Sequence, residues 1–242
     1  MKSLANSLAK LLPPKLAARI DHLTHHRKFF YPYNGGAMNG QTARAEIVRG
    51  LLEYCGIERI IETGTYRGTT TEWFGRFGLP VLSAEAVERY AEFSRLRVRN
   101  LPNVQIHRKN SVDLLKEIVA AKDGLEKPTL FYLDAHWYDY LPLRDEYEII
   151  CEHFSHPIMV VDDFQVPDDP DYGFDDYGPG KALTLDYFTA NGAAMPAHIF
   201  FPVTKARWET GARRGCVVLT NDAALAETIE RRVPLLRRWR SA

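Results

Sequence analysis

The stretch RIIETGTYRGTTTEW, residues 59–73, decides the fold class of the chain. Apolar residues open it, two glycines (Gly64 and Gly68) stand in its middle, and a run of helical character follows. Glycines at such a point allow a tight turn from a strand into a helix and a close approach of the backbone to a ligand. The stretch therefore predicts a strand–turn–helix unit with a ligand site at the turn.

On both sides of this unit, short apolar runs alternate with amphipathic helices. The predicted strands are residues 59–62, 80–84, 104–107, 129–134, 157–162, 198–202 and 215–220. One predicted helix ends near Gly56, others lie near residues 68–77, 86–99, 111–122 and 141–154, and a last one is capped by Asn221 or Asp222. This alternation predicts right-handed crossovers and an α/β sheet covered on both faces. Residues 1–40 are interpreted as an N-terminal helical extension and residues 41–242 as one domain.

The composition argues against nucleic-acid and membrane functions. The 31 basic residues are balanced by 31 acidic ones, so no net positive charge attracts a nucleic acid. No apolar run approaches the roughly 20 residues of a membrane-spanning helix, and Pro13-Pro14 favour an amphipathic surface helix over a signal peptide. Cys55, Cys151 and Cys216 are far apart, as is typical of reduced thiols. We expect a cytoplasmic protein that neither binds nucleic acid nor spans a membrane.

The order of residues in the glycine turn indicates what kind of ligand it binds. Glu62 precedes the first glycine, and a carboxylate there repels a pyrophosphate but attracts a cation such as an amino-acid ammonium. Tyr66 stands where the dinucleotide fingerprint GxGxxG has its second glycine, so that fingerprint is absent. The alternative is that Gly64 and Gly68 only build a structural turn and bind no ligand.

Polar residues also follow the second and third predicted strands. Glu85 comes 23 positions after Glu62, where an acid can accept two hydrogen bonds from ribose hydroxyls; an acid favoured at a helix N-terminus is the alternative. Asn110 and Ser111 stand at a helix start. They either bond an adenine edge or simply cap the helix.

The fourth and fifth predicted strands end in acidic residues. Asp134 and His136 follow the fourth strand, and Asp162 and Asp163 end the fifth. Because neighbouring parallel strands end at one edge of a sheet, three carboxylates and a histidine are expected to converge there. A divalent cation such as Mg²⁺ is one way to neutralise that charge. Solvated aspartates at a strand end and a structural histidine are the alternatives.

Taken together, the glycine turn, Glu85 and the two acidic strand ends resemble class I S-adenosylmethionine (SAM)-dependent methyltransferases over roughly residues 40–220. The form ETGTYRGTTT resembles the E-x-G-x-x-x-G variant of metal-dependent O-methyltransferases. An Asp ending the fourth strand, with Asp-Asp ending the fifth, is similar to the macrocin-type sugar O-methyltransferases.

The resemblance implies a Rossmann-like, doubly wound, seven-stranded mixed sheet of order 3-2-1-4-5-7-6, whose last strand pair is antiparallel. It implies metal-assisted methylation of a small-molecule or sugar hydroxyl, with Mg²⁺ held by Asp134, Asp162 and Asp163. His136 would be the base, at a position where that family more often has a second Asp. The implied SAM contacts are Glu62, Gly64, Thr65, Gly68, Glu85, Asn110, Ser111 and Asp134.

Two other functions remain open at this point. One is a metal-independent N- or C-methyltransferase on the same fold, and the other is a non-catalytic SAM-binding module. The expected partner is a small-molecule or sugar acceptor, and the chain is free to form a homo-oligomer.

The loop of residues 165–181, QVPDDPDYGFDDYGPGK, leaves directly from the predicted metal edge. It combines prolines that stiffen it with glycines that can act as hinges, and it carries Tyr172, Phe174 and Tyr177. One hypothesis is a lid that closes over the acceptor. The other is a packed surface loop whose aromatic residues cover the edge of the sheet.

Overall fold

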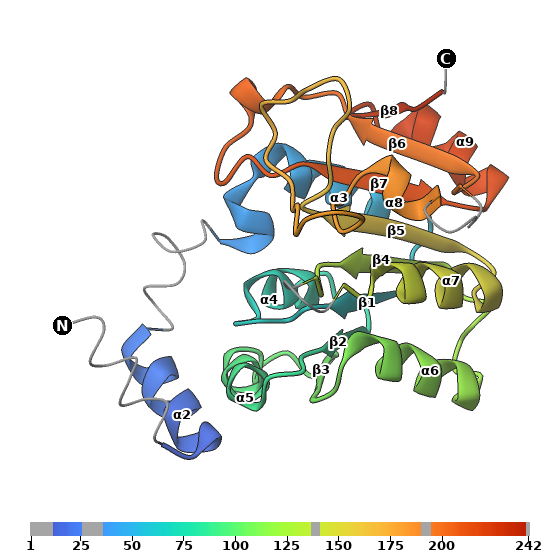
Figure 1. Cartoon of the computed structure of the whole chain (residues 1–242). Coiled ribbons are helices and arrows are strands. Elements are labelled where there is room, and N and C mark those ends of the chain that lie inside the picture. Colours follow the sequence, from blue (N-terminus) through green and yellow to red (C-terminus); the bar gives the residue numbers. More distant parts are fainter. Residues whose placement is uncertain (1–11, 26–35, 137–140, 190–194, 241–242) are drawn as a thin grey trace.

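The computed structural model describes residues 12–25, 36–136, 141–189 and 195–240 of the 242-residue chain. An eight-stranded sheet crosses the molecule in the order β3-β2-β1-β4-β5-β7-β6-β8 (Figure 1). Its strands are β1 Arg59–Thr63, β2 Val81–Ala84, β3 Val104–His107, β4 Thr129–Leu133, β5 Pro157–Asp162, β6 His198–Pro202, β7 Cys216–Thr220 and β8 Leu236–Arg238.

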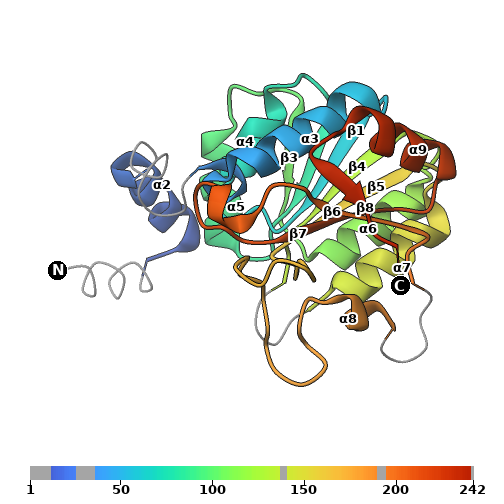
Figure 2. The ribbon, with the colours of Figure 1, turned by 90° about the horizontal axis from the view of Figure 1, so that it is seen from above.

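Helices cover both faces of the sheet, as Figure 2 shows from above. The described helices are α2 Pro14–His25, α3 Thr42–Tyr54, α4 Thr69–Gly75, α5 Glu88–Arg97, α6 Ser111–Ala121, α7 Leu143–His153, α8 Leu185–Thr189 and α9 Ala223–Arg232, with 3₁₀ turns η2 Ala37–Gly40 and η4 Ala206–Trp208. Helices α3, α4 and α9 share one apolar cluster with one face of the sheet, and α6, α7 and α8 share another with the opposite face.

Strand side chains alternate between these two clusters because successive residues of a strand point to opposite faces. In β4, Leu130 and Tyr132 belong to the α3 side, whereas Phe131 and Leu133 belong to the α6 side. Four of the strands (β1, β4, β5 and β7) are buried along their whole length. Burial on both faces explains why these strands are continuous apolar runs in the sequence.

The sheet confirms the predicted strand order and corrects the predicted strand number. Strands β1 to β5 pair in parallel, whereas β7 pairs antiparallel with β5 and β6 antiparallel with β7. The prediction of seven strands was wrong, because Leu236–Arg238 adds an eighth strand antiparallel to β6. The doubly wound, Rossmann-like architecture is as expected.

Strand β8 was not predicted because the segment around it, LLRRWR at residues 235–240, is rich in arginine and has the composition of a solvated basic end. Only Leu236 is fully buried, while Trp239 packs edge-on against Phe201 with ring centroids 5.5 Å apart. Arg237 forms an ion pair with Asp168. Charged side chains are common on an edge strand because they discourage pairing with a further chain, so charge alone does not exclude a strand.

Two helix starts follow the capping rules closely. The Asn110 side chain accepts a hydrogen bond from the Asp113 amide at 2.8 Å and so caps α6. The Asp222 carboxylate caps α9 by accepting from the amides of Ala224 and Leu225. Each cap satisfies amide groups that have no partner inside the helix, and the predicted cap of the last helix is thus assigned to Asp222.

Of the predicted N-terminal extension, the structure describes α2, which lies beside α5 in both views (Figures 1 and 2). Residues 1–11 and 26–35 of this extension lie outside the described residues, and the domain boundary at residue 40 remains a prediction. Among the described helices, none combines the length and the apolarity that a membrane crossing demands.

We predict that Leu236→Ala lowers the free energy of unfolding by about 2–4 kcal/mol, because it removes a buried side chain from the apolar cluster under β8. Urea unfolding followed by circular dichroism measures the change. Arg240→Ala, at a side chain that is 81% exposed, is the matched control and is expected to stay within about 0.5 kcal/mol of the parent. Equal effects of the two substitutions would contradict the assignment of β8 to the sheet.

Candidate functional site

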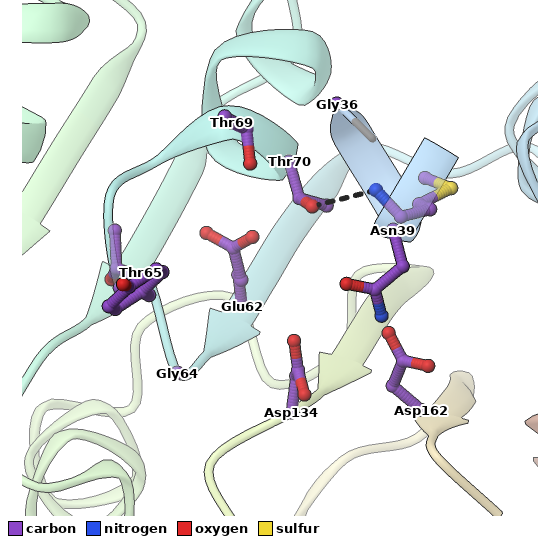
Figure 3. Close-up of a pocket in the computed structure, with 11 residues that line it drawn as sticks. Gly36, Asn39, Glu62, Gly64, Thr65, Thr69, Thr70, Asp134 and Asp162 are labelled. Atoms are coloured by element: carbon purple, nitrogen blue, oxygen red, sulfur yellow. Dashed lines mark hydrogen bonds between the residues drawn. The ribbon is translucent and has the colours of Figure 1, made fainter. Parts of the chain in front are cut away.

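A pocket opens where β1, β4 and β5 end, the edge at which parallel α/β sheets bind ligands. Figure 3 shows the carboxylates of Glu62, Asp134 and Asp162 around it, with the Asn39 amide facing them. The residues lining the pocket are Gly36, Met38, Asn39, Glu62, Gly64, Thr65, Tyr66, Thr69, Thr70, Asp134 and Asp162. Five predicted residues are therefore brought together: Glu62, Gly64, Thr65, Asp134 and Asp162.

The glycine turn depends on Gly64 for a steric reason. Gly64 has a φ of +83°, and a Cβ built there would lie 2.2 Å from the Asp134 carbonyl oxygen. No side chain fits at that separation, so only glycine lets the turn pass this close to the end of β4. Gly68, with a φ of +70°, begins α4.

Glu62 is a buried carboxylate at the end of β1 and is only 2% exposed. Its Oε2 atom accepts hydrogen bonds from the hydroxyls of Ser83, at 2.5 Å, and Thr71. Burial raises the pKa of Glu62 to about 7, although these two bonds act in the opposite direction. A positively charged ligand group would stabilise the ionised form, which suits the predicted ammonium contact.

Glu85 lies just beyond β2, and its two oxygens are already engaged by backbone amides. Oε2 accepts from Tyr66 at 2.6 Å and Oε1 accepts from Val87 at 2.8 Å. Burial raises the pKa of Glu85, and these two hydrogen bonds oppose that effect. Each carboxylate oxygen keeps a second acceptor site, so the ribose contact predicted for Glu85 stays open.

Asn110 and Ser111 do not line the pocket. Asn110 caps α6 through the oxygen of its side-chain amide, as described above. The helix cap is one of the two roles predicted for this residue. Ser111 is buried at the first turn of the same helix. An adenine contact by either residue remains a prediction.

The adjacent residues Asp162 and Asp163 differ in their partners because they leave the end of β5 on different sides. Asp162 is 1% exposed and forms an ion pair with the equally buried Arg44 of α3. Its other oxygen accepts from the Tyr132 hydroxyl at 2.6 Å. The predicted metal ligand Asp162 is therefore already paired with a buried guanidinium.

Asp163 instead joins a second arginine. Its backbone has a φ of +53°, a left-handed conformation that Asp tolerates better than most residues. Its Oδ1 atom accepts from Arg214 Nε at 2.7 Å, and the same guanidinium binds Asp175 from the loop. Arg214 thus holds the end of β5 and the loop together.

Asp134, His136 and Asp163 are close enough to hold a metal ion, since one ligand atom from each lies within 4.8 Å of the others. Loss of water contacts and the negative charges of Asp163 and Glu62 raise the pKa of Asp134 well above its usual range. Burial lowers the pKa of His136 and keeps the imidazole neutral, although Asp163 and Asp175 oppose this. His136 Nε2 lies 3.8 Å from Asp134 and has no hydrogen-bond partner in the part of the chain that the structure describes.

The loop of residues 165–181 is anchored over its first half. Tyr172 is 3% exposed and donates to the Thr204 carbonyl at 2.9 Å, while Gly173 exchanges backbone hydrogen bonds with Arg213 and Gly215. Tyr177 reaches toward the site: its hydroxyl donates to Asp175 and lies 3.4 Å from the His136 carbonyl. The base of the loop is therefore scaffold, and lid movement remains a hypothesis only for its tip.

Sequence reasoning missed the residues that neutralise and cover this edge. Arg44 could have been found, because it falls at helical spacing with the apolar residues Ile47, Val48 and Leu51, where a charged side chain must be buried and paired. Nothing in the turn-rich segment ETGARRG distinguishes Arg214 from its neighbour Arg213.

The pocket-lining segment 36–39 was missed as well. It is held by a hydrogen bond from the Met38 amide to Thr70, at 3.0 Å (Figure 3).

The chain was compared with protein families, with curated proteins and with solved structures. No protein-family model and no curated protein sequence matches the chain. Its structure is similar to an O-methyltransferase from Bacillus cereus in complex with S-adenosylhomocysteine (SAH), at 16% identity and a TM-score of 0.52, over 90% of this chain and 97% of the other. It is also similar to the O-methyltransferase TomG from Streptomyces achromogenes, involved in tomaymycin synthesis and in complex with SAM, at 18% identity and a TM-score of 0.54, over 91% and 96%. The chain therefore has the fold of these methyltransferases.

We predict that Glu62 makes stability fall as the pH rises from about 4.3, its pKa in an unfolded chain, to about 7, its pKa in the folded protein. Between these values the folded protein keeps a proton that the unfolded chain has lost, so deprotonation favours unfolding. The Glu62→Gln variant lacks this group. Its free energy of unfolding, relative to the parent, should rise by about 2–3 kcal/mol between pH 5 and pH 8.

Urea titrations at several pH values provide the measurement. Glu146, whose pKa burial also raises to about 7, is present in both proteins and cancels in the difference. Parallel pH profiles of the parent and the variant would show that Glu62 is ionised in the folded protein already at low pH.

Proposed function

We propose that the protein is a SAM-dependent methyltransferase that transfers a methyl group to a hydroxyl of a small molecule or sugar. The observation that carries the proposal is a buried carboxylate, Glu62, that faces a pocket between the glycine turn and Asp134. A pocket lined by acidic groups favours a cationic ligand, and SAM brings both an ammonium and a sulfonium. The fold shared with SAM- and SAH-bound O-methyltransferases supports the same conclusion.

The residues fit SAM at two points. Glu62, once ionised, would accept from the ammonium, and Gly64, whose turn passes close to Asp134, would offer the ligand a backbone without a side chain. Glu85, Thr65 and Gly68 would contact the nucleoside end, with Asn110 and Ser111 as further proposed contacts. The chemistry asks the protein mainly to hold donor and acceptor in line and to exclude water.

His136 is the proposed base for the acceptor hydroxyl. A base must begin without the proton that it will accept, and burial, which lowers the pKa of His136, favours this neutral form of the imidazole. Its Nε2 atom is unpartnered within the described residues, so it is free to take the proton. Asp134, at 3.8 Å, and Asp175, at 4.0 Å, would stabilise the imidazolium that results.

A divalent cation fits the same edge. We propose that Asp134 and Asp163 hold it, with either Asp162 or His136 as third ligand. Carboxylate oxygens suit Mg²⁺ or Mn²⁺. A bound cation would lower the pKa of a chelated acceptor hydroxyl. The two arrangements differ: with Asp162 as ligand His136 remains the base, whereas with His136 as ligand Asp162 keeps its pairing with Arg44.

One observation favours a metal-independent methyltransferase as the second candidate. The negative charge that suggested a cation is met in part by protein groups, because Arg44 pairs with Asp162 and Arg214 with both Asp163 and Asp175. In that case Asp134 and Glu62 remain as acidic groups for the cofactor, and His136 acts as base without assistance.

The remaining proposals concern the surroundings of the protein. We propose a small-molecule acceptor rather than a nucleic acid, because basic and acidic residues balance. A cytoplasmic location agrees with three free cysteines.

We predict that the protein binds SAH with a dissociation constant of about 1–100 μM, a range usual for enzyme ligands, measured by isothermal titration calorimetry. Glu85→Gln should weaken binding about tenfold, since it removes a charged acceptor. Glu88→Gln, three residues further along and paired with Arg108, is the control expected to bind as the parent does. Absence of SAH binding by the parent would refute the proposed function.

We predict that Mn²⁺ binds the protein and that Asp163→Asn weakens its binding at least about tenfold, the scale of loss at metal sites. Electron paramagnetic resonance of free Mn²⁺ measures this without an acceptor. Loss of binding in His136→Ala makes His136 the third ligand, whereas loss in Asp162→Asn, with His136→Ala unaffected, leaves His136 as base. Mn²⁺ affinity equal in the parent and in Asp163→Asn would contradict the metal site and favour the metal-independent candidate.

A further inference from the structure

A carboxylate of helix α2, that of Asp21, contacts the glycine turn. Asp21 forms ion pairs with Arg67, at 3.6 Å, and with Arg89. Arg67 belongs to the glycine turn itself, between Tyr66 and Gly68, and Arg89 lies in the first turn of α5. The side chains of Asp21 and Arg67 are each 13% exposed, so water screens this pair far less than an ordinary surface pair.

The face of α2 that carries Asp21 is packed against the domain. Ala17 and Ala18 are almost completely buried, and His22 meets the Phe93 ring edge-on, at 5.5 Å between centroids. Small residues let the helix approach α5 closely. The contact is therefore a packed interface with a charged centre, and Asp21 has a defined position in it.

Arg67 in turn is held among aromatic rings beside the turn. Its guanidinium carbon lies 5.5 Å from the centre of the Tyr66 ring and 5.4 Å from that of Phe93. Distances of this size allow cation–π attraction. Tyr66 and Tyr90 are themselves in edge contact at 4.6 Å. Through Arg67, the charge of Asp21 is thus coupled to the position of Tyr66.

Tyr66 needs such support because its backbone is strained. Its φ of +48° lies in the left-handed region, which costs free energy for a residue with a bulky side chain. In this conformation its amide donates to Glu85 at 2.6 Å, and its carbonyl accepts from Ser94 at 2.8 Å. The orientation of the Glu85 carboxylate therefore depends on Tyr66 staying in place.

We propose that Asp21 is a positioning residue for the cofactor: α2 clamps Arg67, Arg67 holds Tyr66, and Tyr66 orients Glu85 toward the ribose hydroxyls. Asp21 does not line the pocket, so it acts through the turn rather than by touching the ligand. The inference rests on the proposed function, since it assigns to the N-terminal helix a part in SAM binding. When the competent turn is only partly populated, the apparent affinity falls by the populated fraction.

The experiment measures SAH binding by calorimetry on the full-length protein. Asp21→Asn keeps the size of the side chain and removes its charge, and should weaken binding about tenfold as the competent turn becomes a minor state. Asp21→Glu should restore at least part of the affinity. Glu230→Gln is the matched control, because Glu230 also lies between two arginines, Arg238 and Arg240, but on α9 at the opposite edge of the sheet.

A double-mutant cycle tests the route through Arg67. If Asp21 acts through that residue, Asp21→Asn should change SAH affinity less than twofold in an Arg67→Met background. Unchanged affinity in Asp21→Asn, with or without a lower melting temperature, would show that the ion pair only stabilises the fold and would overturn the inference, as would full additivity in the cycle. No SAH binding by the parent would overturn the proposed function and this inference together.

Discussion

The buried ion pair of Arg44 and Asp162 is the constraint on which the ligand edge of the sheet depends. A buried charge without a partner is costly, and removing one member of such a pair destabilises a protein strongly. The Arg44 guanidinium has such partners, because it binds the Asp162 carboxylate and the carbonyls of Arg214 and Gly215. One side chain of α3 therefore joins the end of β5 to the start of β7. The amide of Arg44 itself is held by Glu209, at 3.1 Å.

This pair also decides how charge is distributed in the pocket. Because Arg44 neutralises Asp162 and Arg214 neutralises Asp163 and Asp175, the carboxylates without a guanidinium of their own are those of Glu62 and Asp134. Burial raises the pKa values of both groups, and the nearby negative charges of Asp163 and Glu62 add to the effect at Asp134. A site with two such groups gains most from a ligand that brings positive charge, which is the physical basis for proposing SAM. The acidic groups at this edge can be neutralised in two ways. Either Arg44 and Arg214 neutralise them alone, or a bound metal ion does so as well.

Segments far from the glycine turn in sequence complete the site. Residues 36–39 close the pocket over Thr70, the loop after β5 supplies Asp175 and Tyr177, and α2 reaches the turn through Asp21. Gly211 illustrates how tightly these parts fit, because a Cβ there would lie 2.2 Å from the Asn39 carbonyl oxygen. Residues on both sides of position 40 thus build one pocket.

The alternation of strands and helices, the turn at Gly64 and the acidic strand ends could be predicted from the sequence, because each depends on local pattern, whereas the order of the strands was implied by the family resemblance. Apolar runs that alternate with helices require a covered parallel sheet, and a glycine before a helix permits the turn. The partners of the acidic groups could not be predicted in the same way. Arg44 meets Asp162 across 118 positions of the chain and Arg214 meets Asp163 across 51, and β8 is defined only by its pairing with β6. Local pattern places a charge at a strand end, whereas packing brings the opposite charge to it.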